Sequence, residues 1–363
     1  MATFAERTKL LRGVLDGERA YRGPFYVNVG LTRRCNLKCL GCQFHSSERK
    51  GLSPGAGQAT DMALELAQRL AQELPRLGTR EVIVSGEGEP MLHTHWFEIV
   101  RCFKDAGCKV QFITNGTLLN ERNANLVTDS GLEHLRVSLW TVLPAEYVKL
   151  YPGIDVKNMH RTMEGIRRVV ELKREHRTAH PRVTLRGNLN RYNYRSLAKI
   201  IRAGRDLGCD EVVLTRYKTR GGEFSHVAMT DEQEAALRRE LAQMQPLLQP
   251  LPPSCRIEVH PARKEGMPAS LPCYVGWFNA RIRFDGAVMP CAECYVFMGQ
   301  LQDSSFASIW NGEEYRAFRR WSQTRTGLDS LARWCDCNSC CDVRDNLRVH
   351  RLFRWVAPLA RRR

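Results

Sequence analysis

The chain has 363 residues, of which 43% are hydrophobic and 26% charged. This composition excludes a disordered or fibrous chain, and the length suits two domains or one large domain with an extension. Lys and Arg outnumber Asp and Glu by 55 to 39, giving a formal net charge of +16, so anionic partners must be considered. The sequence has no apolar stretch of roughly 18 residues and no signal-peptide block in Met1–Arg22, so we expect a cytoplasmic protein.

Short runs rich in Val, Ile, Leu and Phe alternate with helical stretches before residue 249. In Asp61–Leu77 apolar residues recur every three or four positions behind Thr60, a good N-cap, and His160–His176 has the same period. Alternating strands and helices predict an α/β fold, a parallel sheet or barrel with helices outside and chemistry at the carboxyl ends of the strands. The expected strands are Phe25–Leu31, Glu81–Ser85, Lys109–Ile113, His134–Leu139, Arg182–Leu189 and Glu211–Thr215.

Composition divides the chain into five segments. We expect an N-terminal extension (1–24), a core (25–248), a linker (249–272) that begins with QPLPPS, a Cys-rich domain (273–345) and a basic tail (346–363). The tail has six Arg and no acidic residue, and its apolar residues follow a helical period that Pro358 interrupts. Such a helix suits packing against the domain or peripheral contact with an anionic membrane.

Three of the fourteen Cys stand directly after the first expected strand, at positions 35, 39 and 42. In a chain without an export signal, clustered thiols are reduced and typically bind metal. A structural zinc site needs four ligands, whereas a [4Fe–4S] cubane held by three Cys leaves one iron open. The alternative is half of a zinc site or unrelated core thiols. Four other Cys, at positions 102, 108, 209 and 255, are isolated along the sequence. We expect them to be buried as small hydrophobic residues.

The spacing Cys35-x3-Cys39-x2-Cys42 resembles the cluster motif of the radical S-adenosylmethionine (SAM) superfamily, in which the open iron binds the amino and carboxylate groups of SAM. The segment Gly86-Glu-Gly-Glu89-Pro90 after the second strand is similar to the glycine-rich loop of that family. Polar residues follow the next strand ends, with Asn188 or Asn190 at the fifth. The resemblance covers about 25–248 and implies a partial (β/α)6 TIM-like barrel. The SAM-binding residues that it implies are Gly86, Gly88, Glu89, Pro90, Asn115, Ser138 and Asn188.

One position departs from the family pattern. The residue before the last Cys of the motif, often aromatic in the family, is Gly41 here. Aromatic packing around the adenine of SAM must then come from another residue, and Phe44 is the nearest aromatic residue along the chain.

Seven further Cys lie after residue 272. Alternating residues before Asp285-Gly286 predict a β-hairpin, with Cys273 before it and Cys291 after it. With the later segments Gly299-Gln-Leu and Ser308-Ile-Trp310-Asn, this order is similar to the SPASM or twitch extension of radical SAM enzymes, which holds auxiliary [4Fe–4S] clusters. We favour one cluster, and a zinc ribbon is the alternative. The ligands of that cluster are Cys273, Cys291, Cys337 and Cys340, and a second cluster sharing Cys294, Cys335 and Cys341 stays open.

The resemblance implies an enzyme that cleaves SAM reductively to a 5′-deoxyadenosyl radical. That radical would abstract a hydrogen from a small or carbohydrate-like metabolite, in a dehydrogenation, epimerisation or related step. A reducing partner such as flavodoxin or ferredoxin would supply the electron, and the auxiliary cluster would accept one from the substrate. The substrate, the net reaction and the oligomeric state are not decided by the sequence.

Two other functions compete with this one. The first is a peptide-modifying maturase, although only about 24 residues precede the first strand, too few for a leader-peptide recognition domain. The second is a Cys-rich nucleic-acid binder, suggested by the charge of +16. It would leave the GEGEP loop (86–90) and the turn Thr114-Asn115-Gly116 after the third strand unexplained.

Overall fold

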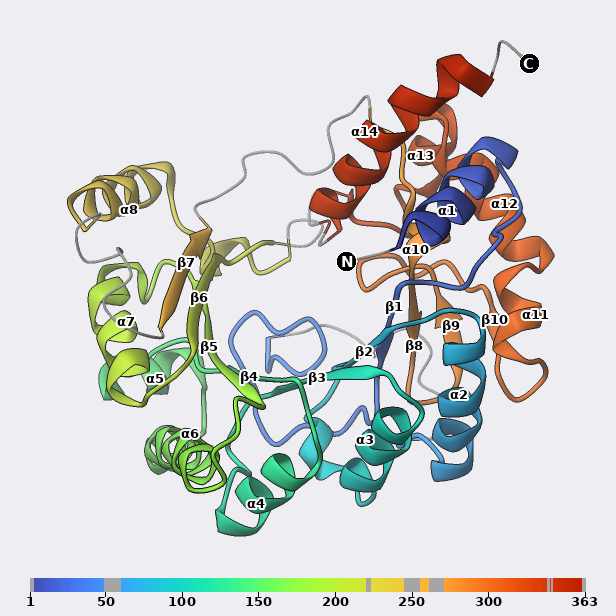
Figure 1. Ribbon diagram of the computed structural model, residues 1–363. Coiled ribbons are helices and arrows are strands. Elements are labelled where there is room, and N and C mark those ends of the chain that lie inside the picture. Colours follow the sequence, from blue (N-terminus) through green and yellow to red (C-terminus); the bar gives the residue numbers. More distant parts are fainter. Residues whose placement is uncertain are drawn as a thin grey trace.

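A computed structural model describes residues 3–48, 60–219, 223–244, 255–260, 271–337, 340 and 342–360. Its strands form one ten-stranded sheet in the order β10-β9-β8-β1-β2-β3-β4-β5-β6-β7. The strands follow an open arc with α2 to α7 on its outer side (Figure 1). The strands are β1 (Tyr26–Val29), β2 (Glu81–Val84), β3 (Lys109–Thr114), β4 (His134–Ser138), β5 (Arg182–Leu189), β6 (Glu211–Arg216), β7 (Arg256–His260), β8 (Asn279–Ile282), β9 (Ala287–Met289) and β10 (Gly299–Gln300).

The helices connect the parallel strands and cover the outer face of the sheet. Most are amphipathic, so their apolar stripes pack on the strands beneath them. The α-helices are α1 (Phe4–Asp16), α2 (Leu64–Arg76), α3 (Trp96–Asp105), α4 (Glu121–Asp129), α5 (Pro144–Leu150), α6 (Lys157–Glu175), α7 (Leu197–Asp206), α8 (Asp231–Gln243), α10 (Val275–Phe278), α11 (Phe306–Trp310), α12 (Glu313–Ser322), α13 (Arg325–Leu331) and α14 (Val343–Ala360). Three short 3₁₀ helices are η1 (Pro90–Leu92), η2 (Tyr194–Ser196) and η3 (Ser225–Val227).

The two faces of the sheet differ in polarity. In β4, Leu135 and Val137 are completely buried toward the helices, whereas Arg136 and Ser138 are only partly buried on the other face. Alternate strand residues point to opposite faces, so the hydrophobic core lies between sheet and helices and polar side chains line the inside of the arc. All strands from β1 to β7 run parallel to their neighbours, which brings their carboxyl ends to one edge.

The α/β fold with a parallel sheet is confirmed, and each of the six expected strands is present within two residues of its expected ends. The expected linker needs a correction, because β7 lies inside it and pairs with β6 in parallel. Its sequence, Arg-Ile-Glu-Val-His, has only two apolar residues and follows a Pro-rich stretch, so a strand was not expected there. The hairpin of the Cys-rich domain also joins the sheet, since β8 pairs with β1 in parallel.

The basic tail begins as a helix packed on the Cys-rich domain. Asn346 is fully buried and its Oδ1 accepts a hydrogen bond from the Tyr274 amide, while the Tyr274 hydroxyl lies 2.9 Å from His350 Nδ1. The helix continues through Pro358, where we expected an interruption. Leu352 and the Arg residues beside it are exposed, so membrane contact stays a prediction. In the described part of the chain, no helix combines the length and apolar character needed to cross a bilayer.

Candidate active site

The loop that follows β1 contains Cys35, Cys39 and Cys42, and neighbouring segments hold its backbone at several points. The amide of Glu89 donates to the Arg34 carbonyl at 2.8 Å, and the amide of Leu40 donates to the Leu150 carbonyl at 2.8 Å. The position of the three sulfurs is therefore set by the ends of β2 and of α5, and not by the loop alone.

Gly41, between the last two Cys of the loop, has φ of +75° and packs against Tyr217. A Cβ at position 41 would lie 2.4 Å from the Tyr217 hydroxyl oxygen, and that hydroxyl donates to the Gly41 carbonyl at 2.8 Å. The Tyr217 ring is also 6.2 Å from that of Trp140, centroid to centroid. Phe44, which we expected to supply aromatic packing, has its ring near the Arg281 guanidinium instead, at 5.9 Å. The aromatic residue beside Gly41 thus comes from the end of β6, far along the chain.

Glu89 of the GEGEP loop joins the carboxyl ends of β2 and β3. One oxygen of its buried carboxylate accepts from the Thr114 hydroxyl at 2.7 Å and the Met91 amide at 3.0 Å, and the other accepts from the Asn115 amide at 2.6 Å. Burial raises the pKa of this carboxyl, and the hydrogen bonds oppose that rise. A Cβ on Gly88 would lie 2.1 Å from the Arg34 carbonyl oxygen, so only glycine allows the two loops to approach this closely.

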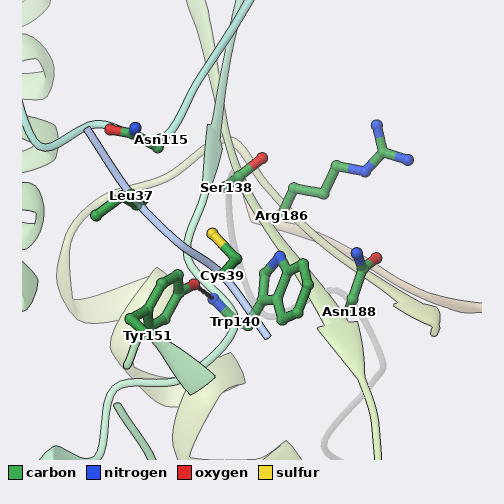
Figure 2. A pocket seen from close by; sticks show the side chains of 8 residues that line it. All are labelled: Leu37, Cys39, Asn115, Ser138, Trp140, Tyr151, Arg186 and Asn188. Atoms are coloured by element: carbon green, nitrogen blue, oxygen red, sulfur yellow. Dashed lines mark hydrogen bonds between the residues drawn. The ribbon is translucent and has the colours of Figure 1, made fainter. Parts of the chain in front are cut away.

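A pocket of about 200 Å³ opens at the carboxyl ends of β3, β4 and β5, beside the Cys loop. Figure 2 shows Cys39 and Tyr151 on one side of Trp140 and Asn188 of β5 on the other, with the Arg186 side chain extending away from Cys39. We call this the site pocket. The residues that line it are Leu37, Cys39, Asn115, Ser138, Trp140, Tyr151, Arg186 and Asn188.

Four expected site residues, Cys39, Asn115, Ser138 and Asn188, meet in the site pocket. Asn190, the alternative to Asn188, is fully buried and bonded within its own turn, where its Oδ1 accepts from the Tyr192 amide at 2.9 Å. The other expected SAM-binding residues, Gly86, Gly88, Glu89 and Pro90, do not line the pocket, and their loop instead packs against the Cys loop through Gly88.

The sequence analysis missed two polar residues of this pocket. Arg186 lies in the middle of a strand and Tyr151 in a turn after α5, and neither belongs to a motif. The Tyr151 hydroxyl accepts from the Trp140 amide at 3.1 Å, which fixes the backbone at the end of β4. In the strand register Arg186 lies opposite Ser138, the serine at the end of β4. A sequence-based alignment of these two strands is the one feature that could have identified Arg186 as a site residue.

The donor chemistry of the first Cys group fits an iron–sulfur cluster. Burial raises the pKa of Cys35 to about 11 and that of Cys39 further above the usual range of a thiol, and the sulfurs also raise one another's pKa. A thiolate at such a site needs a cationic centre in place of the proton, and bound metal ions provide one. Asn115 Nδ2 lies 4.0 Å from Cys35 Sγ and could donate to a sulfur in that state.

The second Cys group also gathers around one small, largely apolar cavity. Cys273, Cys291, Cys337 and Cys340 line it together. Burial raises the pKa of Cys340 to about 12, and that of Cys273 still more. Four Cys lining one cavity match the number of ligands of a fully ligated cubane, so this ligand set stays a prediction.

Two more Cys line the same cavity. Cys294 and Cys335 form a disulfide, although we expected reduced thiols throughout. Their backbones run antiparallel with a bridge between the two residues, and this pairing brings the sulfurs together. A second cluster using them would require the disulfide to be reduced, and Cys341 lies outside the described residues.

A buried ion-pair cluster links the two Cys regions. Glu87 of the GEGEP loop accepts from Arg281 Nη2 at 2.9 Å, and Arg283 Nε lies 3.0 Å from the same carboxylate. Arg281 Nη1 also donates to the Ala292 carbonyl, between Cys291 and Cys294. One guanidinium therefore touches the loop beside the first Cys group and the loop of the second.

Comparison with known proteins agrees with this arrangement. The family model described as the radical SAM superfamily matches residues 29–178, and the model described as an iron-sulfur cluster-binding domain, SPASM, matches residues 273–341. The chain is therefore a radical SAM enzyme with a C-terminal SPASM domain. These families use SAM and [4Fe–4S] clusters, which agrees with the donor sets described above.

Two relatives align along most of both chains. One is the tungsten-containing aldehyde ferredoxin oxidoreductase cofactor-modifying protein of Pyrococcus furiosus, 25% identical over 81% of this chain and 83% of the relative. The other is the AdoMet-dependent heme synthase of Methanosarcina barkeri, 26% identical over 82% of this chain and 85% of the relative. Among solved structures, SuiB of Streptococcus suis bound to S-adenosylmethionine has a TM-score of 0.63 at 13% identity, covering 84% of this chain and 72% of SuiB. That likeness shows the shared fold.

Proposed function

We propose that the chain binds SAM in the site pocket, on a cluster held by Cys35, Cys39 and Cys42, and uses it to abstract a hydrogen atom from a small-molecule substrate. When bound, the cluster and SAM supply an electron and a 5′-deoxyadenosyl radical. The observation that supports this most directly is the meeting of Cys39 with the ends of β3, β4 and β5 around one pocket.

The lining residues suit the polar ends of SAM. The Arg186 guanidinium and the Ser138 hydroxyl are neighbours across two strands, and together they suit the carboxylate of the methionine part. Asn115 lies next to Cys35 and can orient a ligand of the open iron. Trp140 and Tyr151 provide ring surface that keeps water from the reacting atoms.

The substrate class rests on the two sequence relatives. Their names describe modification of a cofactor and synthesis of heme, so we assign a small, cofactor-like molecule rather than a peptide. Neither of these two names mentions a carbohydrate-like substrate. We further propose that the auxiliary cluster on Cys273, Cys291, Cys337 and Cys340 accepts an electron from the substrate, since four ligands leave no iron open.

The test is SAM cleavage by protein reconstituted with iron and sulfide under anaerobic conditions. Dithionite and SAM should yield 5′-deoxyadenosine with the wild type and none with the Cys35→Ala/Cys39→Ala/Cys42→Ala variant. Cys102→Ala is the matched control, because Cys102 lies on α3 away from both Cys groups. Undiminished 5′-deoxyadenosine from the triple variant would refute the proposal. Deuterium-labelled small molecules and peptides can then be compared as hydrogen donors. Deuterium that appears in 5′-deoxyadenosine identifies the donor.

A further inference from the structure

The inner face of the sheet has a second cationic side chain below the site pocket. Ser138 and Arg186 line that pocket and lie opposite each other in the β4–β5 register. Residues two apart along a strand share a face, so Arg136 lies on the same inner face one step further from the pocket, opposite Thr184. Its side chain is half-buried. Arg136 and Arg186 therefore form a column of positive charge that starts at the pocket.

The carboxylates on this face are already occupied by other groups. Glu211 accepts from Arg182 Nη2 at 2.5 Å and from the Thr184 hydroxyl at 2.9 Å. Glu81 accepts a hydrogen bond from the side chain of Gln111. The Arg136 side chain, in contrast, makes no hydrogen bond and no ion pair of 4 Å or less with any residue that the structure describes.

A half-buried guanidinium without a partner is unfavourable, because it has lost part of its hydration without gaining a compensating contact. Burial lowers the pKa of Arg136, and the neighbouring Arg186 lowers it further. Glu81 and Glu211 act in the opposite direction without reaching contact distance. The local balance therefore favours an added negative charge beside Arg136.

We propose that Arg136, one step along β4 from the site pocket, forms an anion subsite that holds a carboxylate or phosphate group of the substrate, while Arg186 serves the SAM carboxylate. The inference rests on the proposed function, because it takes the adjoining pocket to be the SAM site. A planar guanidinium binds either group through two parallel hydrogen bonds. A substrate anchored at Arg136 would extend along the inner face toward the site pocket, where the hydrogen is removed.

The first test needs no variant. Reconstituted wild-type protein is saturated with SAM without a reductant, so that the SAM site is filled, and its arginines are labelled with phenylglyoxal. Peptide mass spectrometry then follows the labelling rate of Arg136. We expect millimolar inorganic pyrophosphate or tricarballylate to slow that rate at least fivefold, while Arg348, exposed on α14, is labelled at an unchanged rate. Protection by pyrophosphate alone identifies a phosphate ester, and protection by tricarballylate alone identifies a carboxylate.

The second test uses Arg136→Gln, with Lys109→Gln as the control because Lys109 is an exposed cation on β3. The anion that protects Arg136 should raise the melting temperature of the wild type and Lys109→Gln by several degrees and leave Arg136→Gln unchanged. Equal shifts in all three proteins, or no protection of Arg136 in the labelling test, would overturn the subsite. Equilibrium dialysis of SAM in the same samples separates the two proposals. Wild-type protein that binds SAM but shows no protection refutes only the subsite, whereas failure to bind SAM refutes the proposed function and the subsite together.

Discussion

Single buried residues at the carboxyl edge hold strand ends together, and Glu89 is the clearest case. Its carboxylate accepts three hydrogen bonds from β3 and from the turn after β2. In Glu89→Gln, the amide nitrogen would face the donor of Thr114 or that of Asn115, and a buried donor would lose its acceptor. We expect the free energy of unfolding to fall by about 1–3 kcal/mol.

Because Asn115 lines the site pocket, the same change should also weaken SAM binding. The dissociation constant should rise about tenfold for each 1.4 kcal/mol of binding free energy that is lost when Asn115 is misplaced. Urea unfolding and equilibrium dialysis measure the two effects. Glu98→Gln on the exposed side of α3 should change neither. Unchanged SAM affinity in Glu89→Gln would show that the carboxylate has no positioning role.

His134, at the start of β4, should make stability depend on pH. Burial lowers its pKa to about 4, and its Nε2 lies 2.6 Å from the Thr184 hydroxyl. Between pH 6.5 and 4 the unfolded chain binds a proton that the folded chain does not, so acid favours unfolding in this window. From pH 7 to pH 5 the free energy of unfolding should fall by up to about 2 kcal/mol, and solvent screening reduces this fall to about 1 kcal/mol.

The measurement is urea unfolding of the wild type, His134→Gln and His160→Gln at several pH values between 5 and 7.5. His134→Gln should remove this part of the acid destabilisation. His160 is exposed on α6, and its replacement should leave the wild-type pH dependence in place. Identical slopes in all three proteins would contradict the assignment to His134.

At the scale of elements, the six core strands could be predicted from the sequence because each combines apolar residues with a flanking turn. β7 was missed although Ile257 and Val259 alternate with polar residues, because the run is short and follows a Pro-rich stretch, and its pairing with β6 supplies the stabilisation. The Cys positions and the GEGEP loop were predictable because each is a local motif at a strand end.

The remaining site residues depend on contacts between distant parts of the chain. Tyr217 fills the space beside Gly41 from 176 residues away, and Arg281 reaches Glu87 across 194 residues. Arg186 lies within a strand between Leu185 and Gly187, where an arginine normally indicates solvent exposure. No local pattern encodes these contacts, so only the folded arrangement identifies the residues.

The contact between the GEGEP loop and β8 gives a prediction at this scale. Glu87→Gln would remove the carboxylate that Arg281 and Arg283 share and leave Arg283 with Asp285 at 3.4 Å, so we expect the free energy of unfolding to fall by about 3 kcal/mol. Glu313→Gln is the control, because its ion pair with Arg320 is exposed and should contribute less than about 1 kcal/mol. Urea unfolding compares the two variants, and equal losses would show that the buried cluster adds no stability.

At the scale of the whole molecule, the continuous sheet makes the SPASM domain part of the same body as the radical SAM core. Two separate donor sets in that body predict about eight irons per chain after reconstitution, four for each cluster. The Cys35→Ala/Cys39→Ala/Cys42→Ala variant should keep about four. Iron, sulfide and zinc analysis checks both numbers. Four irons in the wild type, with zinc bound, would indicate a zinc ribbon, and about twelve irons would indicate a second auxiliary cluster.

The use of the auxiliary site can be tested with Cys337→Ala. If that cluster only braces the domain, folded Cys337→Ala should convert substrate at the wild-type rate, although its yield should fall because metal binding is coupled to folding. We expect the other result, in which the folded variant still cleaves SAM but fails to turn over substrate, because four Cys around one cavity leave no open iron and suit electron transfer. Cys102→Ala should retain both activities. Wild-type turnover by folded Cys337→Ala, shown by iron analysis to lack the auxiliary cluster, would refute electron acceptance there.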